Sequence, residues 1–252
     1  MTPTLPMLEV ATLDRVEIAF EPWSWPFAIE RRDDIERHFV KLQAARTGVW
    51  NGRVLLMRCF RLDNRVLRGA CFETDYASLC AWRDWSHPDP AVCNFFAAAA
   101  LRSADGAYLV GEMAAYTAAA GLLYFPCGTP EPADLDRHGR FDLDGNLRRE
   151  LLEETGLDMA ELDREPGWLF VRDRGYFGLL KQVTARQAGA ALRARIMQHL
   201  RKDAQPEFRD IRIIRGPGDV VPRMPPFVVT FLQAAWRQRS DAAGARLITL
   251  PP

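Results

Sequence analysis

The sequence lacks an excess of either charge, since its 252 residues carry 33 basic and 33 acidic side chains and a formal net charge of zero. Proteins that coat nucleic acid or anionic membranes need a concentrated basic surface, so this balance argues against both kinds of partner. A small phosphorylated ligand needs only a local site and is compatible with the composition. Lysine is also scarce, and almost every basic side chain is an arginine.

The chain has few cysteines and no long apolar run. Its five cysteines, an odd number, include no pair in the CxxC spacing of redox or zinc sites, which favours reduced thiols. No basic segment followed by an apolar segment opens the chain, so no secretory signal is predicted. The longest uncharged stretch, residues 113–130, is broken by glycine and proline and is not expected to span a bilayer. We therefore expect a soluble, cytoplasmic protein.

The order of the predicted elements favours an α+β fold. Helices are expected over residues 29–46, 76–85, 90–102, 145–155, 184–201 and 227–239. Strands are expected over residues 54–61, 66–73, 107–113, 124–126, 168–171, 176–183 and 211–214. The helix over 145–155 has Asp144 as its predicted N-cap and Gly156 as its C-cap. Because no regular strand–helix–strand repeat is present, a mixed sandwich is favoured over a doubly wound sheet.

One segment, Arg149–Leu157, carries an unusual concentration of acid. On a helix, Glu150, Glu153 and Glu154 project from one face about a turn apart. Like charges at this spacing repel one another and raise their proton affinity unless a cation neutralises them. Oxygen ligands of this kind suit a hard divalent ion such as Mg²⁺. The alternative is a solvated acidic face, which is common on helices. Arg149, four residues before Glu153, can pair with the acidic face.

The order Arg-Glu-Leu-x-Glu-Glu-x-Gly-Leu in this segment resembles the second half of the Nudix box, the signature of Nudix hydrolases. Upstream, Phe125–Glu131 resembles the strand and glycine turn where the box begins, and Ala107–Met113 resembles the strand before it. The resemblance covers about residues 103–220. It implies the Nudix fold, an α/β/α sandwich with a mixed sheet between helices. Residues 103–252 would form the hydrolase domain, and residues 1–102 an α+β extension packed on and integrated with it.

The segment before the helix departs from the family pattern. Gly128 lies farther from Arg149 than the pattern has it, so the intervening loop is longer. The first glutamate of the box would fall on Phe141, which has no carboxylate and cannot take its role. Either Asp142 or Asp144 replaces this glutamate, or the chain lacks an acid at this position. Cys127 stands where the first glycine of the pair would be, and its backbone carbonyl can still reach a metal. His138, within the loop, is expected to be exposed to solvent rather than to contact phosphate.

The resemblance implies hydrolysis of a diphosphate by addition of water at phosphorus. Carried over by position, Glu153 and Glu154 would be primary ligands of Mg²⁺, with Mn²⁺ as a substitute. Glu150 would be a further ligand or the base acting on water, and Arg149 the orienting residue. Glu207 lies where many relatives carry another acidic ligand, although a plain surface glutamate is the stronger interpretation.

The substrate class follows from a weaker resemblance. The N-terminal hundred residues, the turn at Gly128–Pro132 and the long loop look like the branch that hydrolyses UDP-sugars. We expect a small nucleoside diphosphate derivative, with UDP-glucose giving UMP and a sugar phosphate, and no nucleic-acid or membrane partner. One alternative is a hydrolase of dinucleotide cofactors or coenzyme A. Another is a catalytically weak or inactive ligand sensor or interaction module, which the displaced glutamate favours. The sequence leaves the oligomeric state open.

Overall fold

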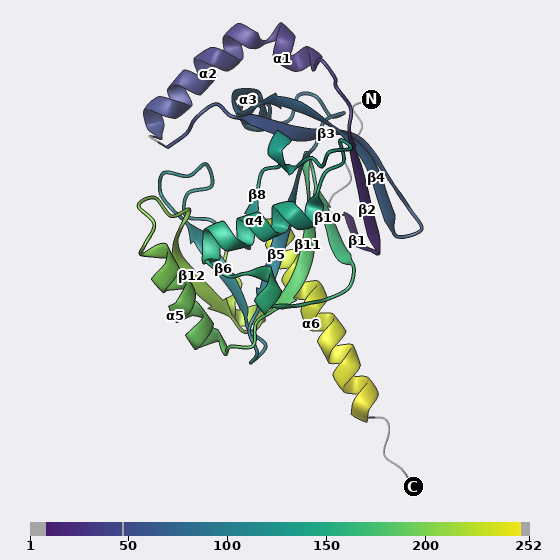
Figure 1. The fold of residues 1–252 in the computed structure, drawn as a ribbon, viewed down its shortest axis with the longest axis vertical. Coiled ribbons are helices and arrows are strands. Elements are labelled where there is room, and N and C mark those ends of the chain that lie inside the picture. Colours follow the sequence, from purple (N-terminus) through teal and green to yellow (C-terminus); the bar gives the residue numbers. More distant parts are fainter. Residues whose placement is uncertain (1–8, 47, 248–252) are drawn as a thin grey trace.

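The computed structural model describes residues 9–46 and 48–247, and only the backbone for 239–247. Two sheets form the framework, a large one in the body of the molecule and a small one beside it (Figure 1). All five cysteines are free thiols. In the described part of the chain no helix has both the length and the apolar character that a membrane crossing requires.

The large sheet is mixed and runs in the order β1–β10–β11–β5–β6–β12. Its strands are β1 (Glu9–Leu13), β5 (Asn94–Arg102), β6 (Tyr108–Met113), β10 (Trp168–Asp173), β11 (Tyr176–Thr184) and β12 (Phe208–Ile214). Three short strands, β7 (Leu123–Tyr124), β8 (Cys127–Gly128) and β9 (Asp163–Arg164), pair with β6, β5 and β11 respectively. Strands β5 and β11 are parallel, and the other neighbours in the sheet are antiparallel.

Helices cover both faces of this sheet. On one face α4 (Leu143–Thr155) and α5 (Gly189–Leu200) contribute Leu151 and Ile196 to an apolar core. On the other face α6 (Pro226–Leu247) contributes Phe227 and Phe231 to a second core. In Figure 1 the C-terminal part of α6 extends away from the body. The expectation of an α+β fold with a mixed sheet between helices is confirmed.

The small sheet has the order β2–β4–β3 and belongs entirely to the N-terminal part of the chain. It consists of β2 (Arg15–Phe20), β3 (Arg53–Asp63) and β4 (Val66–Asp75). Helix α3 (Tyr76–Asp84) packs on it through Leu79 and Trp82, and α1 (Pro26–Glu30) and α2 (Arg32–Ala45) complete this layer (Figure 1). Single turns of 3-10 helix lie at η1 (Pro132–Asp134), η2 (Met159–Glu161) and η3 (Pro217–Asp219). The segment 1–102 also supplies β1 and β5 to the large sheet.

The expected helix over residues 90–102 is wrong, because most of this segment is β5 in the middle of the large sheet. Its side chains alternate between two buried faces. One set packs toward α4 (Phe95, Ala97, Ala99) and the other toward α6 (Phe96, Ala98, Ala100). A strand that is buried on both faces shows no alternation of apolar and polar residues. Because alanine has a high helix propensity, the alanine run of this segment predicts a helix instead.

Smaller differences concern helix ends. Helix α4 begins at Leu143, and its N-cap is Asp142, whose Oδ1 accepts from Gly145 N at 2.9 Å, rather than Asp144. Gly156 ends α4 with φ 68°, as predicted. The helix expected from residue 184 begins only at Gly189, because Thr184 still belongs to β11. The helix expected over 29–46 is divided at Arg31 into α1 and α2.

Candidate functional site

Two of the predicted acidic side chains, Glu150 and Glu154, lie together beneath β8. They project from α4, and only 8% of Glu150 and 5% of Glu154 is exposed. The backbone N–H of Cys127 donates to Glu154 Oε2 at 2.8 Å. A β-carbon built on Gly128 would lie 2.0 Å from Glu150 Oε1, so that carboxylate rests directly on the glycine backbone. The residues from the two halves of the box-like motif therefore meet in space.

Glu153, the third acid of the cluster, has a different environment. Its side chain is 59% exposed, and its Oε2 lies 3.2 Å from Arg149 Nη1. An exposed ion pair of this kind is weak and is readily exchanged for another partner. The structure thus joins Glu150 and Glu154 at one place and leaves Glu153 at the solvent edge of the same helix.

Arg149 connects the acids of this region. Its Nη2 lies 2.8 Å from Glu150 Oε1 and 3.1 Å from Asp134 Oδ1, while Nη1 reaches Glu153. A guanidinium can serve several carboxylates at once because its five N–H donors are fixed in one plane. Arg149 therefore contacts two acids of α4, Glu150 and Glu153, and its orienting role stays a prediction.

Asp134 is a site residue that the sequence did not reveal. It lies in η1 of the long loop, is 7% exposed, and accepts from Asn146 Nδ2 at 3.0 Å and from Glu131 N at 2.9 Å as well as from Arg149. Asp142 and Asp144, the expected replacements for the missing glutamate, are exposed at the start of α4. The only available signal was the spacing of Glu131 and Asp134, which is typical of a capping box.

The pKa values of the buried pair are shifted upward. Burial raises the pKa of Glu150 to about 7; Arg149 opposes the shift, and the charges of Glu153 and Glu207 add to it. Burial, followed by the charges of Glu207 and Glu150, raises the pKa of Glu154 well above its ordinary value. Without a cation, these side chains therefore tend to hold protons near neutral pH.

Two further predicted residues border this pair. Glu207, between α5 and β12, is exposed, and its carbonyl accepts from Ala114 N at 2.7 Å. Its charge is felt by both Glu150 and Glu154, so it belongs to the same electrostatic neighbourhood. Burial and the neighbouring acids raise the pKa of the Cys127 thiol well above its ordinary value, which makes a nucleophilic thiolate unfavourable.

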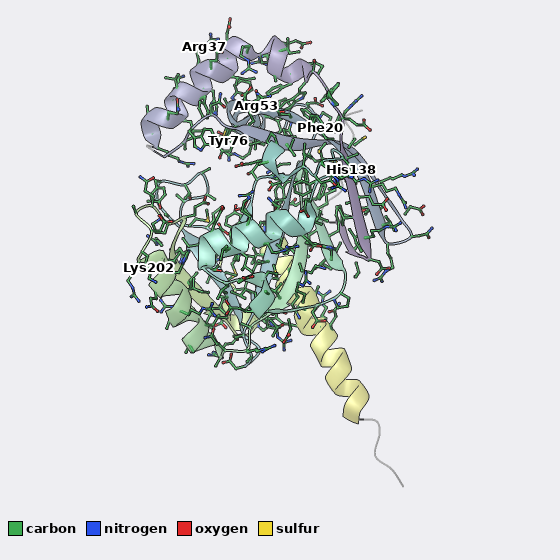
Figure 2. All side chains as sticks on the ribbon, in the orientation of Figure 1. Phe20, Arg37, Arg53, Tyr76, His138 and Lys202 are labelled. Atoms are coloured by element: carbon green, nitrogen blue, oxygen red, sulfur yellow. The ribbon has the colours of Figure 1, made fainter. Side chains whose placement is uncertain are left out.

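His138 lies apart from the acids. It is exposed, as expected, on the loop that packs beside β2, where Phe20 N donates to Gly139 O at 2.7 Å. Figure 2 shows His138 and Phe20 at this side of the molecule, whereas Lys202, at the end of α5, lies at the other side. The structure gives His138 no contact with Glu150 or Glu154 among the hydrogen bonds of the described residues.

The carboxylates of this region match a divalent ion in their chemistry but not in their distances from one another. Carboxylate oxygens that crowd together and tend to hold protons match the chemistry of a hard cation such as Mg²⁺. The side chains are not close enough, however. Over residues 9–46 and 48–238, no three His, Cys, Asp or Glu side chains come near enough to one another to hold a metal. A third ligand would require Glu153 to leave Arg149, or Glu207 to turn inward.

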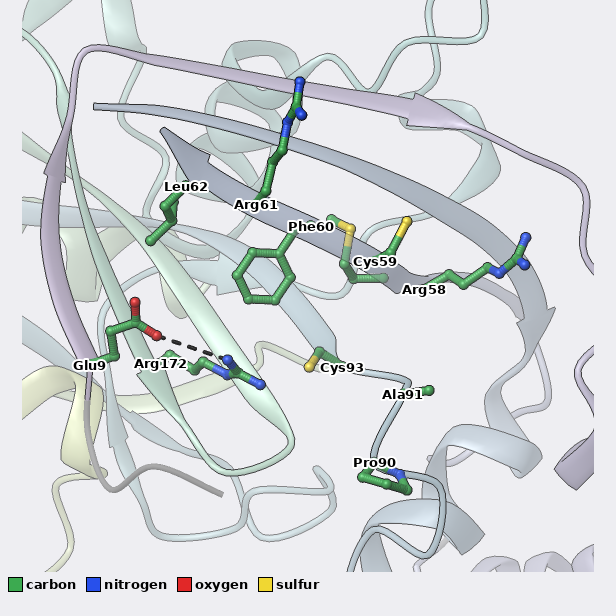
Figure 3. Close-up of a pocket in the computed structure, with 11 residues that line it drawn as sticks. Glu9, Arg58, Cys59, Phe60, Arg61, Leu62, Pro90, Ala91, Cys93 and Arg172 are labelled. Atoms are coloured by element: carbon green, nitrogen blue, oxygen red, sulfur yellow. Dashed lines mark ion pairs between the residues drawn. The ribbon is translucent and has the colours of Figure 1, made fainter. Parts of the chain in front are cut away.

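Two cavities lie away from the acids of α4. One of about 390 Å³ is at the seam between the sheets, where Arg172 Nη1 of β10 and Glu9 Oε2 of β1 lie 3.9 Å apart beside Phe60 of β3 (Figure 3). The other, of about 330 Å³, lies between the large sheet and α6. Neither is lined by Glu150, Glu153 or Glu154.

Comparison with known proteins gave similarity at the level of solved structures only. No family model and no curated protein matches the chain. The chain is similar to the MutT protein of Methanosarcina mazei Go1, with a TM-score of 0.36 and 14% identity over 58% of this chain and 94% of that one. For RenU, a Nudix hydrolase of M. smegmatis, the TM-score is 0.33 with 15% identity over 63% and 89% of the two chains.

A further similar structure is the C-terminal domain of mouse MUTYH in complex with human PCNA, with a TM-score of 0.34 and 16% identity over 60% of this chain and 90% of that one. Of these three structures, RenU is the one described as a Nudix hydrolase.

Proposed function

We propose that this protein is a Nudix-type hydrolase that depends on a divalent cation and splits the diphosphate of a nucleoside diphosphate derivative. The observation that carries the proposal is the pair Glu150 and Glu154, two carboxylates buried side by side against β8. Burying two neighbouring acids disfavours their ionised forms unless a cation compensates. A fold gains no stability from such a pair, so a binding role is the more economical explanation.

Five donors are proposed to hold Mg²⁺, or Mn²⁺ in its place. Glu153 and Glu154 would be the primary ligands, and Glu150, the Cys127 carbonyl and Glu207 would complete the set. A bound divalent ion supplies positive charge that offsets the negative charge of a diphosphate. Glu153 is exposed, and among the described residues its carboxylate pairs with Arg149 alone, so it is the side chain best able to change partner when an ion arrives.

Glu150, Arg149 and Asp134 are proposed to accept the proton from water and to keep the accepting carboxylate in position. Glu150, whose pKa burial raises to about 7, suits a group that accepts a proton from water at neutral pH. Arg149 would keep Glu150 in position through its contact at 2.8 Å, with Asp134 holding the guanidinium from the other side. Water adds to one phosphorus and the diphosphate bridge breaks, which leaves a nucleoside monophosphate and a second phosphate ester.

Among substrates we propose a UDP-sugar, with UDP-glucose giving UMP and a sugar phosphate. The support is the layout of the chain: a long N-terminal segment and a long loop between Gly128 and α4. The balanced charge supports a small-molecule substrate rather than nucleic acid. Five free thiols support a reducing, cytoplasmic setting.

A second function is favoured by one specific observation. No three potential ligands in residues 9–46 and 48–238 are spaced to hold a metal, and Glu153 is paired with Arg149. A protein that keeps the nucleotide-binding fold but binds metal weakly would act as a ligand sensor or interaction module.

The deciding experiment measures release of nucleoside monophosphate from UDP-glucose and dinucleotide cofactors, and of adenosine 3′,5′-bisphosphate from coenzyme A, with Mg²⁺ and with EDTA. We expect Mg²⁺-dependent release by the native chain and a loss of at least about 100-fold in Glu153→Gln, which removes charge but little volume. Glu36→Gln, an exposed glutamate of α2, is the matched control.

Each result decides between the two functions. Release that survives Glu153→Gln contradicts the metal role of that residue. Binding of a nucleotide without release, unaffected by EDTA, supports the sensor instead. Release from a dinucleotide or coenzyme A but not from UDP-glucose keeps the reaction and changes the substrate.

A further inference from the structure

The cavity between the large sheet and α6 lies on the face opposite α4, so it is separate from the acidic pair. Its volume of about 330 Å³ is at the lower end of the range for small-molecule sites. The sheet contributes Leu169 and Leu180, and α6 contributes Phe231 and Ala235. These side chains give the cavity an apolar wall on two sides.

One side chain of the cavity is polar and lacks a partner. Arg102, at the end of β5, has a buried Nε with no hydrogen-bond acceptor. Nor does any hydrogen bond or ion pair of the described residues involve its guanidinium, in contrast to Arg149, which contacts three carboxylates. A buried donor without an acceptor is costly, and native proteins rarely leave one unless a ligand or water completes it.

A second donor lies beside Arg102 on the same face of the sheet. Gln182 of β11 also lines the cavity, and its Oε1 accepts from the hydroxyl of Tyr108. This hydrogen bond orients the amide so that its remaining polar atom is the nitrogen, which is a donor. Over the part of the chain whose side chains are described, the other ionisable side chain of the cavity is Glu165, which is exposed and lies in the turn before β10.

We propose that this cavity binds a small monoanionic carboxylate with an apolar body. The carboxylate would accept from Arg102, whose planar donors match two oxygens, and the apolar part would lie between Leu180 and Phe231. A single half-buried arginine suits one negative charge. A doubly charged phosphate would need further cations, and among the described side chains the only other ionisable group of the wall is an acid.

The test uses sodium octanoate and its uncharged analogue octanamide, titrated calorimetrically into the full chain. Three variants accompany the native protein. Arg102→Met removes the guanidinium and its charge and keeps an unbranched apolar stem. Ala234→Leu narrows the cavity from α6. Arg237→Met changes an exposed arginine of the same helix that does not line the cavity, and serves as the control.

We expect the native chain and Arg237→Met to bind octanoate equally. Arg102→Met and Ala234→Leu should each bind it at least tenfold more weakly, and the native chain should bind octanamide at least tenfold more weakly than octanoate. The proposal is overturned if the native chain binds no octanoate, if Arg102→Met binds it unchanged, or if inorganic phosphate competes as tightly as octanoate. Should Arg102→Met fail to fold, the acid–amide comparison and Ala234→Leu decide the outcome.

Discussion

The carboxylate of Glu150 lies directly on the α-carbon of Gly128, where a β-carbon would stand 2.0 Å from Oε1. Because of this contact, any side chain at position 128 would force the Glu150 carboxylate to move. It also explains why Glu150 is 8% exposed although it belongs to the acidic face of its helix.

The first prediction concerns this contact. In Gly128→Ala the new methyl group should displace Glu150, lowering the rate of diphosphate hydrolysis and costing about 1–3 kcal/mol of unfolding free energy. Urea unfolding and the hydrolysis assay measure the two effects. Gly216→Ala is the control, because a β-carbon there meets nothing within 4 Å and φ is −165°. Equal behaviour of the two variants would show that the Glu150 contact is unimportant.

The second prediction concerns Asp134. Asp134→Asn keeps the side-chain volume but removes the charge that faces Arg149 Nη2 at 3.1 Å. We expect a loss of about 1–3 kcal/mol in unfolding free energy, since a hydrogen bond between charged groups is replaced by an imperfect one. Turnover should fall as well, because Arg149 then has fewer contacts to hold it against Glu150. Asp163→Asn, an exposed residue of β9, should change neither quantity; native-like turnover in Asp134→Asn would contradict the positioning role.

The third prediction concerns pH. Burial raises the pKa of Glu150 from 4.5 to about 7, so the folded state prefers the protonated acid more than the unfolded state does. The stabilisation from this group is therefore complete below pH 4.5 and is lost as pH rises through 7. The difference in unfolding free energy between the native chain and Glu150→Gln should change by about 3 kcal/mol over this range in EDTA.

Urea unfolding at a series of pH values measures this difference. Glu161→Gln is the control with the opposite sign, since a hydrogen bond from Arg195 lowers the pKa of Glu161. Added Mg²⁺ should stabilise the native chain more at pH 8 than at pH 5, because the ionised carboxylates bind it. A difference between native chain and Glu150→Gln that stays flat with pH contradicts the raised pKa.

The fourth prediction concerns the alanine run of β5. Ala98 is fully buried and faces the core beneath α6. Ala98→Leu should overpack that core and lower the unfolding free energy by about 1–3 kcal/mol, whereas Ala204→Leu, in an exposed turn, should be neutral. Thermal unfolding compares the two. A neutral Ala98→Leu would mean that the sheet and α6 are less tightly packed than they are in the structure.

The sequence predicted the acidic helix well because its signals are local. The spacing of three glutamates places them on one face, and Gly156 supplies the left-handed residue that ends α4. Asp134 could not be found in this way, because its contact with Arg149 depends on how a long loop folds back. The pairing of Arg149 with Glu153, by contrast, follows from their separation of four residues on a helix, which the sequence shows directly.

The strand β5 shows the opposite limit. Its apolar residues are plain in the sequence. A strand is usually distinguished from a helix by the spacing at which buried, apolar residues recur. Because β5 is buried on both faces, nearly all its residues are apolar and that spacing cannot be seen. Residues 66–73 and 176–183 were predicted as strands because turn residues bound them, at Asn64 and Gly175.

The parallel pairing of β5 with β11 has a consequence for how the chain reaches this fold. Asn94 to Arg102 leave the ribosome long before their partners, Tyr176 to Thr184. Until then a strand that is apolar on both sides has no neighbour on its β11 side, a condition that favours slow folding and aggregation. The strand order thus delays completion of the central part of the large sheet until residue 184 has been synthesised.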